Sequence, residues 1–209
     1  MKAFIIHNPE YVQSVELAQK SMRSCITHGM PAEVVSGVPK DQARLIASQL
    51  GYNVNGFDYV ETQRVRPLRD GQIGCFLAHR DQWIRCIKLN EPIMVLEHDA
   101  ALVAPFQLKK PFRHVLNLQR VIWDDPNWPW HAKAQRVFVD NLKENGNAKY
   151  MVLSGTCAYA ITPEGAHRLL HSSMNMLPVD LFTNKTVVDI DDHAENIIKV
   201  ANDFSLVAP

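Results

Sequence analysis

The stretch PIMVLEHDA, residues 92–100, decides the fold and also raises the question of function. Its apolar residues 93–96 run directly into Glu97, His98 and Asp99. A short apolar run between a proline and a polar cluster is typical of a buried strand. Because ligands bind outside the carboxyl ends of strands in open α/β sheets, the two carboxylates are a candidate ligand site. An ordinary strand followed by a polar turn is the alternative, and pattern alone favours it.

Strand and helix patterns alternate on the amino-terminal side of this stretch. Apolar runs at residues 3–6 and 32–35 predict two strands. Nearly helical spacing predicts a helix over residues 12–25 and a second one that is capped by Asp41 and stopped by Gly51. This alternation favours an α/β domain with a largely parallel sheet.

The segment between Asp70 and Pro92 predicts the longest helix. Asp70 is a suitable N-cap, Pro92 ends the pattern, and Trp83 falls on the flank of the apolar stripe. Arg80 interrupts that stripe, either as a snorkelling residue at its edge or as a cation directed at a phosphate or an acidic site. The stripe itself consists of Ile73, Phe76, Leu77, Ile84 and Ile87.

The second half of the chain is irregular before regular patterns resume. Residues 122–133, IWDDPNWPWHAK, interleave tryptophan and proline and therefore predict neither a regular helix nor a central strand. Apolar runs predict strands over 150–153 and 159–161, and a helix over 163–170 with Thr162 as its N-cap.

Composition restricts the function classes. A chain of 209 residues, 46% hydrophobic and 21% charged, fits one globular domain. Lys plus Arg and Asp plus Glu each number 22, so the net charge of zero gives no reason to expect nucleic acid or an anionic membrane as a partner. Four scattered cysteines without a CxxC pair indicate buried thiols, and the absence of a signal-like or spanning apolar window favours a cytoplasmic protein without a transmembrane segment.

Three acidic pairs are candidates for a site that binds a hard metal ion. Glu97 and Asp99 are two residues apart, so both carboxylates would share one face of an extended backbone. Asp189 and Asp191 have the same spacing, and a third pair lies within residues 123–126. Carboxylates suit Mg²⁺ or Mn²⁺, which would neutralise a departing diphosphate. The spacing alone ranks none of the three.

A resemblance ranks them. The stretch from residue 71 to residue 100 resembles the core signature of glycosyltransferase family 25, the bacterial lipooligosaccharide galactosyltransferases and their collagen-galactosyltransferase relatives. Gln72, Ala78 and His98 depart from the glutamate, serine and middle aspartate that are usual in the family. The matching residues are Gly71, Ile73, Gly74, Cys75, His79, Trp83, Glu91, Pro92, Glu97 and Asp99.

The resemblance implies a GT-A fold, an α/β Rossmann-type sandwich with a mostly parallel central sheet. A single domain over residues 1–209 would divide into a nucleotide-sugar part at about 1–105 and an acceptor part at about 106–209. The implied reaction is a metal-dependent, inverting transfer of a hexose, most often galactose, from a UDP-sugar donor to an oligosaccharide acceptor, with Mn²⁺ or Mg²⁺ as cofactor.

The resemblance also implies roles for the acidic residues. Glu97 and Asp99 match the metal-binding acids, with Asp99 the more direct ligand. Inversion needs one carboxylate base to take the proton of the acceptor hydroxyl. Asp180 in LPVD is the first candidate for this base and Asp191 is its rival.

Other residues are candidates for binding the donor. His7 and Asn8 follow the first strand, where a nucleotide lies in a Rossmann-like half. His79 either contacts the diphosphate or holds the helix in place. Thr156 and Tyr159 either line the sugar pocket or serve turn and core packing.

Two further functions and one aromatic cluster stay open. The departures from the family signature allow a degenerate, non-catalytic domain that binds a nucleotide sugar or a glycan. Clustered acids and histidines also suit a metal-dependent phosphohydrolase. Trp123, Trp128 and Trp130 either stack on an acceptor sugar or anchor an irregular loop.

Overall fold

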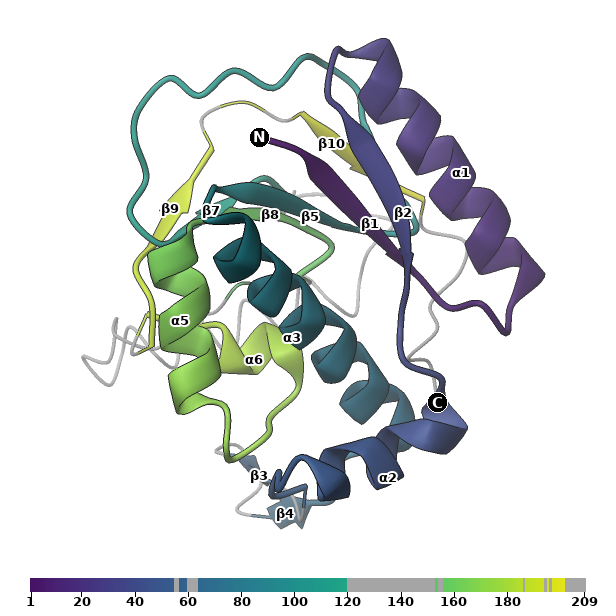
Figure 1. Ribbon diagram of the computed structural model, residues 1–209, viewed down its shortest axis with the longest axis vertical. Coiled ribbons are helices and arrows are strands. Elements are labelled where there is room, and N and C mark those ends of the chain that lie inside the picture. Colours follow the sequence, from purple (N-terminus) through teal and green to yellow (C-terminus); the bar gives the residue numbers. More distant parts are fainter. Residues whose placement is uncertain are drawn as a thin grey trace.

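The fold was analysed in a computed structural model (Figure 1). The predicted strand over 150–153, apart from residue 153, and the tryptophan-rich segment 122–133 with its acidic pair lie outside the described residues. The structure describes residues 1–54, 57–59, 64–119, 153, 156–185, 187–193, 195 and 197–201.

A six-stranded sheet forms the centre of the molecule, in the order β2-β1-β5-β8-β7-β9. β1 runs parallel to both β2 and β5, β7 runs parallel to β9, and β8 is antiparallel to its two neighbours. The expected α/β fold with a mostly parallel sheet is therefore confirmed. The strands are β1 (Ala3–His7), β2 (Ala32–Ser36), β5 (Ile93–Glu97), β7 (Val115–Asn117), β8 (Ala158–Ile161) and β9 (Ile190–Asp192).

Helices cover both faces of this sheet (Figure 1). α1 lies on one face, and α3, α5 and α6 lie on the other. Two small antiparallel pairs complete the described fold, β3 (Phe57–Tyr59) with β4 (Arg64–Arg66) and β6 (Ala100–Leu102) with β10 (Ile198–Val200). The helices are α1 (Val12–Thr27), α2 (Lys40–Gln49), α3 (Asp70–Leu89), α5 (Pro163–Ser172) and α6 (Val179–Phe182).

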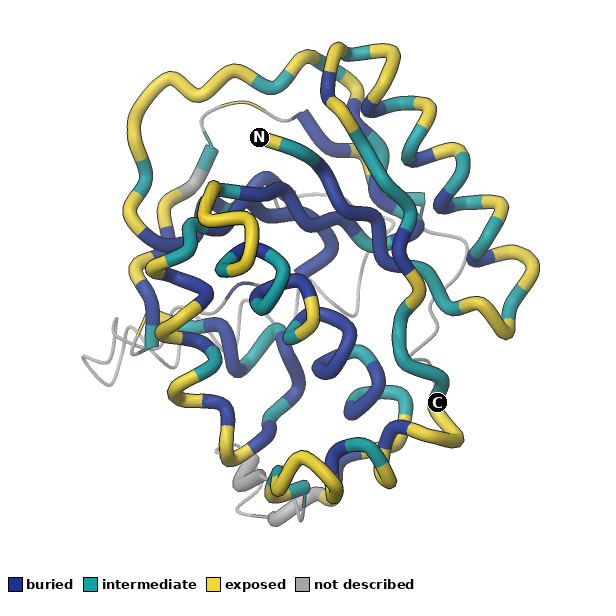
Figure 2. Tube along the Cα trace, in the orientation of Figure 1, coloured by how far each residue is buried: buried dark blue, intermediate teal, exposed yellow. Residues whose placement is uncertain are grey.

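Alternation along the central strands builds two cores, one on each face. In β1, Phe4 and Ile6 face the α3 side, whereas Ala3 and Ile5 face α1. Successive side chains of a strand point to opposite faces, so a strand that is covered on both sides must be apolar throughout. This explains the unbroken apolar runs, and Figure 2 shows the central strands as the continuous buried region.

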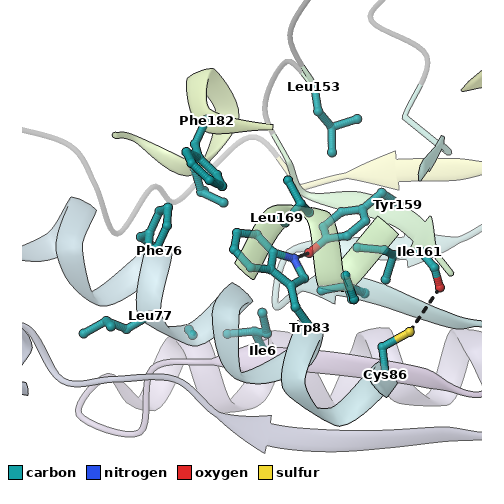
Figure 3. Packing of buried hydrophobic residues seen from close by; sticks show 14 of the residues in the cluster. Ile6, Phe76, Leu77, Trp83, Cys86, Leu153, Tyr159, Ile161, Leu169 and Phe182 are labelled. Atoms are coloured by element: carbon teal, nitrogen blue, oxygen red, sulfur yellow. Dashed lines mark hydrogen bonds between the residues drawn. The ribbon is translucent and has the colours of Figure 1, made fainter. Parts of the chain in front are cut away.

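The centre of the α3-side core is an aromatic cluster (Figure 3). The ring of Phe76 meets Trp83 edge-on at 5.6 Å and Phe182 at 5.1 Å, and Trp83 stacks on Phe182 at 5.9 Å. Trp83, predicted at the flank of the apolar stripe, is fully buried, so the buried face of α3 is wider than that stripe. The reason is that α3 packs against α5 and α6 as well as the sheet, which widens its buried face, while Ile84 and Ile87 remain half-buried.

Two predicted helix caps were wrong. Pro39 is the N-cap of α2, which places Asp41 in the first turn, where its charge still favours the helix dipole. Arg69 is the N-cap of α3, and the carboxylate of Asp70 pairs with Arg44 at 2.8 Å.

Three other residues at helix ends behave differently. The side chain of Gln72 accepts a hydrogen bond from the backbone of Arg69 at 3.0 Å, so this departure from the family signature serves the start of α3. Thr162 caps α5 as predicted, accepting from Gly165 at 3.1 Å. At the other end of α3, Asn90 adopts a left-handed conformation with φ 53° and ends the helix before Pro92.

All four cysteines are free thiols, and three of them are buried, as the sequence indicated. None of the helices that the structure describes is long and apolar enough to cross a membrane.

Candidate active site at the carboxyl ends of β1 and β5

A cavity lies where β1 and β5 end side by side. Ile6 pairs with Glu97 in the parallel register, so the residues that follow both strands meet at one edge of the sheet. About 790 Å³ of space lies within the cavity, and part of this space is open solvent. Its lining comprises Ile6, His7, Asn8, Tyr11, Gly37, Val38, Lys40, Gly71, Gly74, Cys75, Ala78, His79, Glu97, His98 and Asp99.

The β1 side of the cavity carries the two residues predicted to meet the nucleotide. Burial lowers the pKa of His7, and its Nδ1 atom is buried without a hydrogen-bond partner among the described residues. Asn8 begins the turn into α1, where its backbone amide donates to Ser14 at 2.9 Å and its side chain accepts from Glu10 at 3.0 Å. The structure therefore brings both residues to the cavity wall.

Three side chains converge on one oxygen of Glu97 at the end of β5. Its Oε1 atom lies 3.2 Å from Nε2 of His79, 3.4 Å from the hydroxyl of Thr156 and 4.0 Å from the thiol of Cys75. Cys75 and His79 are one turn apart on α3, so both face the strand end. Thr156 reaches the carboxylate from a left-handed backbone position with φ 42°, which is unusual for a β-branched residue.

A buried chain of polar contacts continues from Glu97 into the core. Nδ1 of His79 lies 3.0 Å from the hydroxyl of Tyr159, and the indole N–H of Trp83 donates to the same hydroxyl at 3.0 Å. Tyr159 is 1% exposed and does not belong to the described cavity lining, so it reaches the cavity only through His79.

Asp99 sits beside Glu97 but is placed differently from the sequence argument. His98 and Asp99 form a turn rather than extended backbone, so strand alternation does not explain why both carboxylates line the cavity. Oδ1 of Asp99 is buried and has no hydrogen-bond partner among the described residues. Burial, and then the charge of Glu97, raise the pKa of Asp99 to about 7.

These features define a fit for a hard divalent cation. Two carboxylates line one cavity, and one of them has a buried oxygen without a hydrogen-bond partner among the described residues, so a positive ion would stabilise them. A second, mixed donor set overlaps this pair, because ligand atoms of Cys75, His79 and Glu97 all lie within 4.8 Å of one another. The sequence reasoning missed this set, although the four-residue spacing of Cys75 and His79 on a predicted helix would have indicated it.

The two candidate bases lie in very different places. Asp180 lies on α6, which packs against α3, and its charge is the third cause, after burial and the charge of Glu97, that raises the pKa of Cys75. Asp191 lies on β9, three strands from β5, which is about 14 Å at the usual strand spacing. It is also level with Met94, about 10 Å before Glu97 along the strand. Neither candidate belongs to the described cavity lining, and Asp191 is the one that lies far from the end of β5.

Arg80 points away from the cavity. Its guanidinium donates to the hydroxyl of Tyr52 at 2.6 Å, lies 5.6 Å from the centre of that ring and pairs with Asp81 at 3.3 Å. The structure favours the interpretation of Arg80 as a residue at the edge of the helix stripe.

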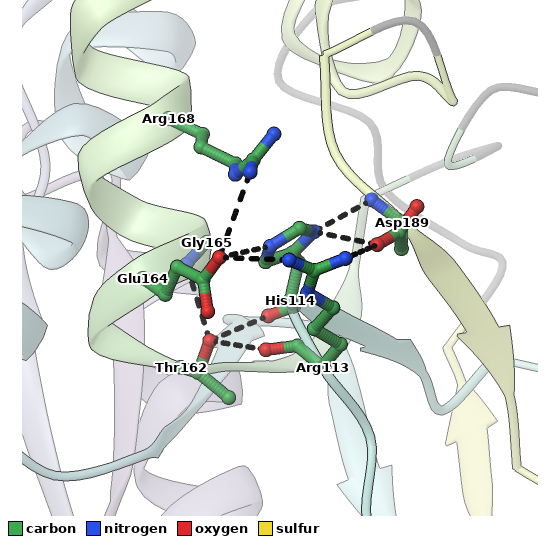
Figure 4. A network of polar contacts seen from close by, with 7 residues as sticks. All are labelled: Arg113, His114, Thr162, Glu164, Gly165, Arg168 and Asp189. Carbon is green, nitrogen blue, oxygen red and sulfur yellow. Dashed lines mark hydrogen bonds and ion pairs between the residues drawn. The ribbon is translucent and has the colours of Figure 1, made fainter.

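Asp189, one member of the second acidic pair, belongs to a separate polar network between β7, α5 and the start of β9 (Figure 4). His114 is 1% exposed; its Nδ1 accepts from the backbone of Asp189 at 2.9 Å and its Nε2 contacts Glu164 at 3.0 Å. Arg113 pairs with both carboxylates at 3.5 Å. Each carboxylate therefore has cationic or histidine partners, as expected for a structural network.

Taken together, the fold and the cavity define a Rossmann-like α/β protein with a cavity at the strand ends that two acidic residues line. The family model described as "Glycosyltransferase family 25 (LPS biosynthesis protein)" matches residues 7–183. The chain belongs to glycosyltransferase family 25.

Curated relatives agree with this membership. The chain is similar to a "Glycosyltransferase 25 family member" of Anopheles gambiae, 32% identical over 130 residues, which are 58% of this chain and 21% of that protein. It is 30% identical over 134 residues to "Procollagen galactosyltransferase 1-A" of Xenopus laevis, covering 60% of this chain and 21% of that protein. It is 29% identical over 178 residues to "Procollagen galactosyltransferase 2" of Mus musculus, covering 78% of this chain and 27% of that protein. The chain thus spans between a fifth and somewhat over a quarter of these relatives.

Proposed function

We propose that the chain transfers a hexose, with galactose as the first candidate, from a UDP-sugar to a hydroxyl of a glycan acceptor with inversion. The observation that carries the proposal is the presence of Glu97 and Asp99 in one cavity at the strand ends of a family 25 chain. The names of the procollagen galactosyltransferases support galactose, and the family description supports a glycan acceptor.

The donor would lie along the cavity from β1 towards α3. His7 and Asn8 would meet the nucleoside, because they follow the first strand of the Rossmann-like half. The diphosphate would lie near Lys40 and the first turn of α3, which Gly71 brings to the cavity wall. The amino-terminal end of a 20-residue helix favours anionic groups through its unpaired N–H groups and dipole.

Glu97 and Asp99 would hold Mn²⁺ or Mg²⁺. When bound, such a cation supplies charge stabilisation to a departing diphosphate. The chain contributes two hard oxygen ligands, one of them the buried, unpaired Oδ1 of Asp99. Asp180 would accept the proton of the attacking acceptor hydroxyl, because it lies on α6, which packs against the helix that carries Cys75 and His79.

A transfer assay tests this function. Purified protein would be incubated with UDP-galactose and Mn²⁺ on an array of glycans and glycosylated collagen peptides, with UDP release and product mass as readouts. The proposal expects product with the wild type, none with Asp99→Ala and none in EDTA, while Asp191→Asn serves as a matched carboxylate control that retains transfer.

Two outcomes would replace the proposal. Binding of UDP-galactose or of a glycan without any product would indicate the non-catalytic domain, and the departures at Ala78 and His98 would then be the residues to restore. Hydrolysis of a simple phosphate ester without binding of any UDP-sugar would indicate a phosphohydrolase.

A further inference from the structure

A four-residue hydrogen-bond chain links the aromatic core to the cavity. α3 contributes Trp83 and His79, β8 contributes Tyr159, and β5 contributes Glu97. Successive contacts measure 3.0, 3.0 and 3.2 Å. The first three side chains are each no more than 1% exposed, and Figure 3 shows the indole nitrogen of Trp83 meeting the hydroxyl of Tyr159 inside the core.

The chemistry of the groups gives this chain a direction. An indole N–H can only donate, so the oxygen of Tyr159 accepts from Trp83. The arrangement in which the proton of Tyr159 points to Nδ1 of His79 gives that proton an acceptor among the described residues. A neutral imidazole that accepts at Nδ1 carries its proton at Nε2, which then donates to Oε1 of Glu97. Every buried donor thereby has an acceptor, as buried polar groups require.

This direction argues against His79 as a metal ligand. A metal ion on Nε2 would move the imidazole proton to Nδ1, where it would face the hydroxyl of Tyr159. The proton of that hydroxyl would then lose its acceptor inside the core, which is unfavourable. The grouping of Cys75, His79 and Glu97 is therefore better explained as a hydrogen-bonded arrangement that commits Oε1 of Glu97.

We propose that Trp83 and Tyr159 are positioning residues that act through His79 to hold the Glu97 carboxylate in the orientation that binds the metal ion. This inference rests on the proposed function, in which Glu97 and Asp99 are the ligands. With Oε1 held by His79 and Thr156, the carboxylate loses little freedom on binding a cation. Groups that orient metal ligands in this way are typically worth 10–100-fold in metal affinity or activity.

The proton order is tested first, without metal or substrate. Long-range ¹⁵N–¹H correlation spectra of the purified protein report the tautomer of each neutral histidine, and loss of one signal in His79→Gln assigns His79. The proposal expects the proton on Nε2. A proton on Nδ1 would overturn it.

Mn²⁺ binding to the purified protein, followed by calorimetry, tests the positioning. His79→Gln places an amide N–H close to the position of Nε2, whereas His79→Asn mimics Nδ1. The proposal expects His79→Gln, which keeps a donor to Glu97 but loses the contact with Tyr159, to weaken binding about as much as Tyr159→Phe does, about tenfold. His79→Asn, which loses the donor to Glu97, should lose more, up to about 100-fold. Equal losses in the two variants would show that His79 only packs, and the positioning role would be refuted.

The role of Tyr159, which acts on Glu97 only through His79, is tested with Tyr52 as a matched control. Tyr159→Phe and Tyr52→Phe each delete one hydroxyl, but the hydroxyl of Tyr52 contacts Arg80 and Ser173 instead of His79. We expect Tyr159→Phe to weaken Mn²⁺ binding about tenfold and Tyr52→Phe to leave it unchanged. Equal affinities in both variants would overturn the proposal.

The failure of the underlying function is recognisable in the same experiment. If Glu97→Gln binds Mn²⁺ as well as the wild type, Glu97 is not a ligand, and the metal site is refuted together with the positioning role. The ¹⁵N spectra would still decide the proton order by themselves.

Discussion

Replacing Asp99 by Asn should stabilise the metal-free protein and remove its response to metal. Burial and the charge of Glu97 raise the pKa of Asp99 from 3.8 to about 7. A raised carboxyl pKa means that stability is fully present below pH 3.8 and is lost as the pH rises through about 7, where Asp99 ionises. A pKa raised by about three units corresponds to a loss of about 4 kcal/mol in the free energy of unfolding once Asp99 is ionised. This value is an upper limit, because relaxation of the site lowers the cost.

Thermal unfolding at pH 8 in EDTA measures the gain. At about 2–4 °C per kcal/mol for a chain of this size, Asp99→Asn should raise Tm by up to roughly 8–16 °C. Adding Mn²⁺ should then raise the Tm of the wild type but not that of the variant, since the variant lacks the anionic ligand. An Asp99→Asn protein that is less stable than wild type in EDTA, or that keeps the Mn²⁺ response, would refute the reasoning.

Three further predictions concern other parts of the molecule. Asp180→Asn should reduce transfer at least 100-fold while Asp191→Asn stays near wild type, measured by UDP release with the acceptor identified on the array; the reverse order would exchange their roles. The hydrogen bond from His114 and the nearby arginines lower the pKa of Glu164, so the stabilisation by this carboxylate is present above the usual glutamate pKa and is lost as the pH falls. Glu164→Gln should therefore flatten the acid side of a plot of stability against pH. An unchanged curve would contradict this prediction. Gly165→Ala would place a Cβ atom 2.6 Å from the backbone oxygen of His114 and should cost about 1–3 kcal/mol by urea unfolding, and a neutral effect would show that α5 moves freely against β7.

The central strands of the fold could be predicted, because the apolar patterns that indicate them lie within a few consecutive residues. Apolar runs located β1 and β5 to within a residue, since strands covered on both faces must be apolar throughout. The half-buried edge strand β2 was located equally well, although it contains Glu33. Helix caps were less predictable, because the carboxylate of Asp70 is drawn to Arg44 from another helix. Such a contact leaves no trace in the neighbouring sequence.

The site was only partly predictable, for reasons of distance along the chain. Glu97 and Asp99 could be proposed from their place after an apolar run, although the turn at residues 98–99 brings them together by a different geometry. The contact between His79 and Tyr159 joins residues 80 positions apart, so spacing could not reveal it. Spacing also could not separate Asp180 from Asp191, because only the strand order shows that β9 lies at the far edge of the sheet.

The most direct test of the proposed function is a thermal-shift panel of UDP-galactose, UDP-glucose, UDP-GlcNAc, UDP-GalNAc and GDP-sugars, each with Mn²⁺ and with EDTA. A ligand at 100 times its dissociation constant adds about 2.7 kcal/mol, which is roughly 5–10 °C in Tm for this chain. We predict a Mn²⁺-dependent shift of that size with one UDP-sugar, and its loss in Asp99→Ala. A panel that is flat with Mn²⁺, or a shift that persists in EDTA and in Asp99→Ala, would contradict a metal-dependent donor site at Glu97 and Asp99.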